Sequence, residues 1–152
     1  MIEVWSCALS GHRKLPSTFN ENALYDKLEE LILDGCNTFY CGMAQGFDLS
    51  ALKCLVDLKK KYKFYIEACI PYAGHESRFP YAEKQRFYEL LEWCDRKTVL
   101  FPGYRDGCFL ARNRYMVDNS DAVLVYCRQE TGGTAYTANY AINKGKATIF
   151  LY

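Results

Sequence analysis

The sequence lacks several features that mark common classes of protein. It has only two histidines, and none of its eight cysteines forms a C-x-x-C pair, so a bound metal is not expected. Its net charge of +1 gives no overall field that would attract nucleic acid or a membrane surface. No apolar stretch is long enough to span a bilayer. These absences exclude a metal site and a membrane partner, and they argue against a nucleic-acid partner.

The cysteines predict a reduced, cytoplasmic protein. Cys7, Cys41, Cys69 and Cys127 lie within or beside apolar runs, where a reduced thiol packs as a small hydrophobic group. Residues 1–6 lack the basic start and the long apolar core of a signal peptide. We therefore expect free thiols and a cytoplasmic location.

The length and the composition predict one domain over residues 1–152. A chain of 152 residues can bury a substantial core, and a hydrophobic fraction of 50% with a charged fraction of 24% is ordinary for a folded protein. Segments of strand length alternate with amphipathic segments of helical period along the whole chain. No repeat or low-complexity linker interrupts this alternation, which favours a single folding unit.

The alternation places the elements with some precision. Expected strands cover residues 2–9, 36–41, 64–70, 96–101, 122–127 and 147–151. Expected helices cover residues 20–34, 47–61, 81–94, 109–118 and 134–144. Thr18 with Glu21 would make a capping box for the first helix. Strand–helix alternation implies right-handed crossovers, so we predict an α/β fold of three layers with a mainly parallel open sheet.

Three glycine-bearing segments stand where a predicted strand runs into a helix: residues 10–13, 42–48 and 131–134. Glycine lets the backbone approach a ligand closely, and a helix N-terminus offers unpaired N–H groups and a partial positive charge. All three segments follow the carboxyl end of a strand, where open parallel sheets bind their ligands. They predict one shared pocket for a phosphate-bearing ligand.

Each candidate in this pocket has a structural alternative. Asp48 would accept hydrogen bonds from ribose hydroxyls, or it would cap the following helix. Thr134 would add a donor to a phosphate, or it would be the N-cap of the last helix. Arg112 would clamp a phosphate while Asn113 reads a base or ribose edge, or Arg112 would form a surface ion pair.

The other candidates lie at the ends of the first and third strands. Arg13 is a long donor that could reach the same pocket, whereas His12 fits a hydrogen-bonded structural group as well as a ligand contact. Tyr72 would cover a base. His75 and Glu76 could do acid–base work, but they are expected to be exposed loop residues. The predicted ligand-binding residues are Gly11, His12, Arg13, Gly42, Met43, Ala44, Gly46, Asp48, Tyr72, Arg112, Asn113, Gly132, Gly133 and Thr134.

Residues 10–13, 42–48, 112–118 with 120–121, and 132–134 resemble the motifs of the YpsA-like branch of the SLOG group, in the order found there. This group joins the DNA-processing protein Smf/DprA with the LOG "lysine decarboxylase-like" proteins. The resemblance implies a Rossmann-like fold that binds a nucleotide or a nucleotide-derived ligand similar to ADP-ribose or NAD. It favours a sensing or signalling module over a catalyst. Members often self-associate, so a homo-oligomer is one of the expected states.

The resemblance leaves two alternatives. LOG-type hydrolases carry a P-G-G-x-G-T-x-x-E pattern whose glutamate supports N-glycosidic cleavage, but that position holds Thr137 here. Losing such a group costs roughly 10²–10⁴-fold in rate, so hydrolysis is disfavoured unless Asp48 or Glu130 substitutes. Residues 42–48 and 112–114 also resemble motifs of DprA, which binds single-stranded DNA. A local patch of Arg13, Arg78 and Arg112 would have to serve that role.

Overall fold

A computed structural model describes residues 3–151, in which six strands alternate with five α-helices. The strands are β1 (Trp5–Gly11), β2 (Cys36–Cys41), β3 (Tyr65–Tyr72), β4 (Arg96–Phe101), β5 (Ala122–Tyr126) and β6 (Ala147–Phe150). The helices are α1 (Glu21–Leu33), α2 (Phe47–Leu58), α3 (Tyr81–Leu91), α4 (Cys108–Asp118) and α5 (Gly133–Asn143). The first strand was expected from residue 2, which lies outside the described residues, and it begins at Trp5 instead.

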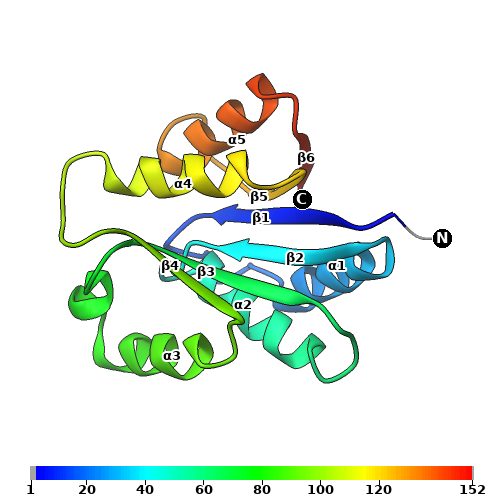
Figure 1. The fold of residues 1–152 in the computed structure, drawn as a ribbon, viewed down its shortest axis with the longest axis horizontal. Helices are drawn as coiled ribbons and strands as arrows, with labels where there is room; N and C mark the ends of the chain where they lie inside the picture. The colour runs from blue at the N-terminus through cyan, green and yellow to red at the C-terminus, as the bar shows by residue number, and fades with distance from the viewer. Residues whose placement is uncertain (1–2, 152) are drawn as a thin grey trace.

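The strands form one sheet in the order β4-β3-β2-β1-β5-β6, and every neighbouring pair is parallel. Helices α1, α2 and α3 cover one face of the sheet, and α4 and α5 cover the other (Figure 1). The predicted three-layer Rossmann-like fold is therefore confirmed, with a sheet that is parallel throughout. Strand order reverses between β1 and β5, so the topological switch point lies at the carboxyl ends of these two strands.

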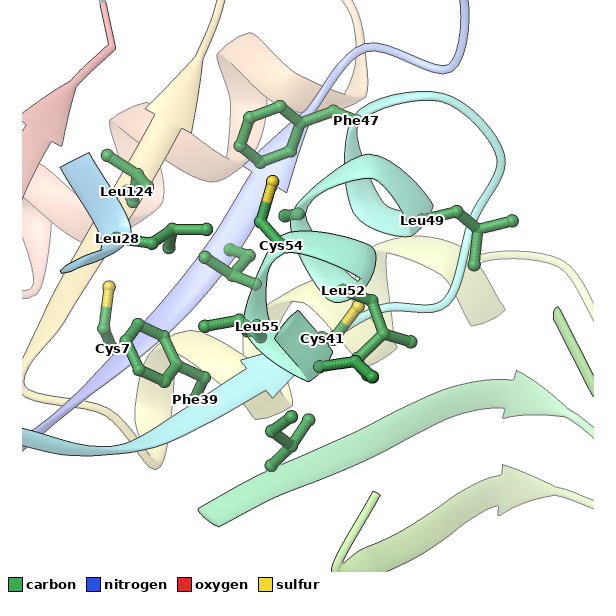
Figure 2. Packing of buried hydrophobic residues seen from close by; sticks show 14 of the residues in the cluster. Cys7, Leu28, Phe39, Cys41, Phe47, Leu49, Leu52, Cys54, Leu55 and Leu124 are labelled. Atoms are coloured by element: carbon green, nitrogen blue, oxygen red, sulfur yellow. The ribbon is translucent and has the colours of Figure 1, made fainter. Parts of the chain in front are cut away.

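The main core lies between the sheet and α1 and α2. Leu52 and Leu55 of α2, which the helical period placed inward, are fully buried in the same cluster as Phe39 of β2 (Figure 2). Across the sheet, α5 buries Ala135, Ala138 and Ala141 as expected. Ile142 was also expected inside, but its side chain is 53% exposed.

Local structure differs from the sequence expectation in two places. Asn20, not Thr18, is the N-cap of α1, and its Oδ1 accepts a hydrogen bond of 3.0 Å from the Ala23 amide. Because α1 begins at Glu21, the side chain directly before it is the one in capping position. A short 3₁₀ helix, η1 (His75–Arg78), forms in a loop that was expected to be irregular. Within residues 3–151 no helix combines the length and the apolar character that crossing a membrane requires.

The loops that follow β1 and β2 pack directly on each other. The Phe47 amide donates to the His12 carbonyl at 3.0 Å. A Cβ atom on Gly46, whose φ is +78°, would lie 2.2 Å from the Arg13 carbonyl oxygen. A Cβ atom on Gly11 would lie 2.2 Å from Cγ of Phe47. Both glycines are therefore required for the two loops to pack against each other, whether or not a ligand binds.

We expect Gly46→Ala to destabilise the fold more than Gly145→Ala, measured as the free energy of unfolding in denaturant titrations. Gly145 has a similar φ of +74° but no atom within 4 Å of its Cβ position, so it reports the backbone effect alone. That effect is about 1–2 kcal/mol. Close contact at Gly46 should add about 1–3 kcal/mol. If the two variants lost the same free energy of unfolding, the contact between the loops at Gly46 would not contribute to stability.

Candidate functional site

A cavity of about 240 Å³ lies at the switch point, and we call it the switch-point cavity. Segments from all three glycine-bearing joints border it, together with α4. Ten of the predicted binding residues line it: Gly11, His12, Arg13, Ala44, Asp48, Arg112, Asn113, Gly132, Gly133 and Thr134. Turns far apart in the sequence thus converge on one rim of the sheet.

The other four predicted residues lie elsewhere. Gly42 does not line the cavity but lies next to Asp48, which does. An added Cβ on Gly42 would lie 2.8 Å from Oδ2 of Asp48. Met43 is fully buried and has a φ of +62°, which is rare for a residue with a side chain. Gly46 packs on the loop after β1. Tyr72 lines a second cavity of about 490 Å³ that adjoins the first.

Arg112 connects α4 to the end of β2. Its side chain is only 4% exposed, Nη1 donates to the Gly42 carbonyl, and Nε donates to Oδ1 of Asn113 at 2.7 Å. Within residues 3–151 no hydrogen bond engages Nη2, which leaves donor capacity on a buried guanidinium beside the cavity. A surface ion pair of Arg112, for which Asp118 and Asp121 are the candidate partners in the sequence, is wrong because the side chain is buried. Asp121 instead accepts from Ser6, and Asp118 accepts from Tyr140.

Asn113 has a structural task that was not foreseen. Besides holding Nε of Arg112, it donates from Nδ2 to Oγ1 of Thr137 at 3.0 Å. Thr137 in turn donates to the Gly133 carbonyl at 2.8 Å. The residue at the position of the LOG glutamate is therefore buried and ties α4 to the first turn of α5. It supplies no acid or base to the cavity.

Asp48 closes the turn before α2 and does not cap that helix. Its Oδ2 accepts from the Ala44 amide at 3.2 Å, while the N-cap position belongs to Gly46. Burial raises the pKa of the Asp48 carboxyl to about 6, although the nearby Arg112 guanidinium opposes the shift. The cavity wall therefore carries a carboxyl whose charge is expensive to form.

The first turn of α5 presents backbone donors to the same cavity. Gly132 is the N-cap with φ +101°, and no side chain caps the helix. Thr134 is thus the second residue of α5, and the expectation that it caps the helix is wrong. The open N–H groups and the helix dipole combine with Arg13 and Arg112 to make this part of the cavity electropositive.

The two histidines differ from each other in role. His12 accepts a hydrogen bond of 2.8 Å from the Arg128 amide at Nε2, so its proton resides on Nδ1 and it joins the loops after β1 and β5. His75 was expected to be exposed, and this is wrong because it is 5% exposed. Its Nε2 donates to the Met43 carbonyl at 3.2 Å and so supports the left-handed residue.

Sequence reasoning also missed Phe109, which lines both cavities. The Arg13 guanidinium carbon lies 4.6 Å from the centre of the Phe109 ring. A guanidinium held in this way by an aromatic face is a cation–π pair. The signal in the sequence was the position of Phe109 three residues before Arg112, which places both on one face of α4.

The raised pKa of Asp48 predicts a measurable pH dependence of stability. Between its ordinary value of 3.8 and about 6 the folded state holds the proton more tightly than the unfolded state does. The stabilising contribution is complete below pH 3.8 and is lost as pH rises to about 6. Relative to Asp48→Asn, the wild type should lose on the order of 3 kcal/mol across this window. Parallel pH profiles of the two proteins in chemical denaturation would contradict the assignment.

Comparison with known proteins identifies related sequences and folds. The model of the YspA SLOG family matches residues 13–150. The UPF0398 protein OB1025 of Oceanobacillus iheyensis is 24% identical over 121 residues, which cover 78% of this chain and 66% of that protein. The fold resembles DNA processing protein A (DprA) from Streptococcus pneumoniae, with a TM-score of 0.70 and 19% identity over 97% of this chain.

A second DprA, from Helicobacter pylori, matches with a TM-score of 0.67 and 20% identity over 96% of this chain. That structure concerns the single-stranded DNA binding mode of its protein. The chain covers 50% of the first DprA and 64% of the second. The expectation that nucleic acid is an unlikely partner is contradicted by these likenesses. Net charge averages over the whole surface, so it does not test whether a local site can hold a phosphate backbone.

Proposed function

The chain belongs to the YspA SLOG family, and from this premise we propose that it binds a small nucleotide-type ligand in the switch-point cavity. The observation that carries the proposal is the convergence of Arg13, Arg112 and the uncapped first turn of α5 on the same cavity. A phosphate group matches this set, since guanidinium and backbone N–H donors both favour an anion. Nucleotides that resemble ADP-ribose or NAD fit the family resemblance.

We propose a sensing or signalling role in the cytoplasm rather than catalysis. Thr137 donates to the Gly133 carbonyl and accepts from Asn113, which leaves it no part in proton transfer. Asp48 is the carboxyl of the cavity wall, and one of its oxygens is bound to the Ala44 amide. All eight cysteines are free thiols, which supports a reducing compartment.

Arg13→Ala provides the sharpest test of phosphate binding. Arg13 is exposed and makes no hydrogen bond through its guanidinium within residues 3–151, so its removal should leave the fold intact. We expect the affinity for AMP, ADP-ribose or NAD to fall about tenfold in calorimetric titrations. At about 100 times the dissociation constant, a bound ligand should stabilise the wild type by roughly 2.7 kcal/mol in thermal-shift assays.

Lys14→Ala is the matched control, because it removes the same charge from the adjacent exposed residue, which does not line the cavity. Equal losses in the two variants would indicate general charge attraction and would contradict a site at Arg13. Absence of binding by all three nucleotides would refute the proposal. Release of free base from AMP, abolished by Asp48→Asn, would instead identify a hydrolase.

Single-stranded DNA binding is the second candidate function, and the likeness to two DprA structures favours it. Single strands bind to grooves that combine positive charge with aromatic faces. Such a combination exists beside the cavity, where Arg13 stacks on Phe109 and Tyr104 lies next to Tyr72. A strand would use the same phosphate site for one of its linkages.

Salt dependence separates the two functions. For single-stranded DNA, the logarithm of the binding constant should fall with the logarithm of salt concentration by about 0.7 per phosphate contacted. Fluorescence anisotropy of a labelled oligothymidine should therefore show a binding constant that falls more steeply with salt concentration than the binding constant of AMP does. Competition by AMP for the oligonucleotide would show that both use the switch-point cavity. Failure of oligonucleotides to bind at low salt would remove this second candidate.

A further inference from the structure

The second cavity shares Arg13, Ala44 and Phe109 with the switch-point cavity, so the two are adjoining parts of one hollow. Its volume of about 490 Å³ is the larger of the two. The rest of its wall is mainly aromatic and comes from β3, η1 and the loop before α4. These residues include Tyr72, His75, Phe79 and Tyr104.

Three rings form a corner in this wall. The Tyr72 ring lies 5.6 Å from Tyr104 at an angle of 89°, and 6.1 Å from Phe109 at 73°. Rings that meet edge to face leave other faces open to a further ring. Tyr104 is 64% exposed, so its ring is accessible from the solvent. The arrangement offers a stacking surface.

The charge of the wall restricts what can stack there. Arg13 and Arg78 are its charged residues among the described part of the chain, and no carboxylate lines it. His75 adds no charge to this wall, because burial lowers its pKa to about 4 and the neutral ring keeps its proton on Nε2. Within residues 3–151, the remaining acceptor Nδ1 has no hydrogen-bond partner. Aromatic faces by themselves attract cations. Here the Arg13 guanidinium already lies over the Phe109 ring, and with Arg78 it repels a second cation, so the wall favours neutral rings.

We propose that the second cavity binds the uncharged heterocyclic ring of the same ligand, so that the protein selects nucleotides with a neutral base over those with a cationic ring. This inference rests on the proposed function, because a phosphate in the switch-point cavity anchors the ligand. Arg13, present in both walls, then lies between the phosphate and the ring. The adenine of an ADP-ribose-like ligand satisfies this requirement, whereas an oxidised nicotinamide does not.

Matched ligands test the ring separately from the phosphate. Calorimetric titration of the wild type should give an affinity for AMP about tenfold or more above that for ribose 5-phosphate, which lacks the ring. Nicotinamide mononucleotide should bind more weakly in its oxidised, cationic-ring form than in its reduced, neutral-ring form. The two forms carry the same ribose and phosphate, so the difference reports the ring alone.

Tyr104→Ala tests the stacking surface. Because Tyr104 is largely exposed, its removal should leave the fold intact, which the melting temperature checks. We expect its affinity for AMP to fall about tenfold, close to that for ribose 5-phosphate. Tyr81→Ala is the matched control, since Tyr81 is a 77% exposed tyrosine on α3 that lines neither cavity. Its affinity for AMP should equal that of the wild type.

The outcomes distinguish the ring site from the phosphate site. Equal binding of AMP and ribose 5-phosphate, both weakened by Arg13→Ala, would overturn the ring site and leave the phosphate site standing. Loss of both ligands to the same degree in Tyr104→Ala would also overturn it, because the tyrosine would then act on the phosphate site. Absence of binding by either ligand in the wild type would overturn both proposals.

Discussion

The geometry of the site depends on one buried guanidinium. Arg112 carries its charge into the interior, where an unpaired ion would be strongly unfavourable. The Gly42 carbonyl, the Asn113 amide and the neighbouring carboxyl of Asp48 share the stabilisation. Each of these groups belongs to a segment that also shapes the cavity, so the requirements of the charge and of the site coincide.

The loop after β2 is fixed by side chains from outside it. Arg112 holds the Gly42 carbonyl, and His75 holds the next carbonyl, that of Met43. Met43 adopts a left-handed conformation that a side chain normally disfavours, and such strain persists only where surrounding contacts determine it. Preorganisation of this kind lowers the entropy lost when a ligand binds. It also links the two cavities, since Arg112 borders one and His75 the other.

The sequence was sufficient to predict the layers, the parallel sheet and the rim on which the glycine segments meet. Hydrophobic period identified α2 and α5, and the rule that ligands bind at strand carboxyl ends located the cavity. The sequence alone could not predict that Gly11 leaves room for Phe47 and Gly46 leaves room for Arg13. That requirement arises only when two distant loops meet. His75 escaped for the same reason: a loop histidine is buried here by aromatic rings from β3 and α3.

The error about nucleic acid has a physical origin in how the charges are paired. Net charge counts each arginine against a carboxylate, but Arg112 is held largely by a backbone carbonyl and an amide, and Arg13 by an aromatic ring. The ring does not neutralise Arg13, and the nearby Asp48 carboxyl neutralises Arg112 only in part, so both keep attraction for an anion. The carboxylates that balance the total lie elsewhere, as in the pairs of Lys59 with Asp95 and Lys27 with Glu30. A nearly neutral chain can therefore carry a local excess of positive charge in one cavity, so its net charge does not exclude a phosphate there.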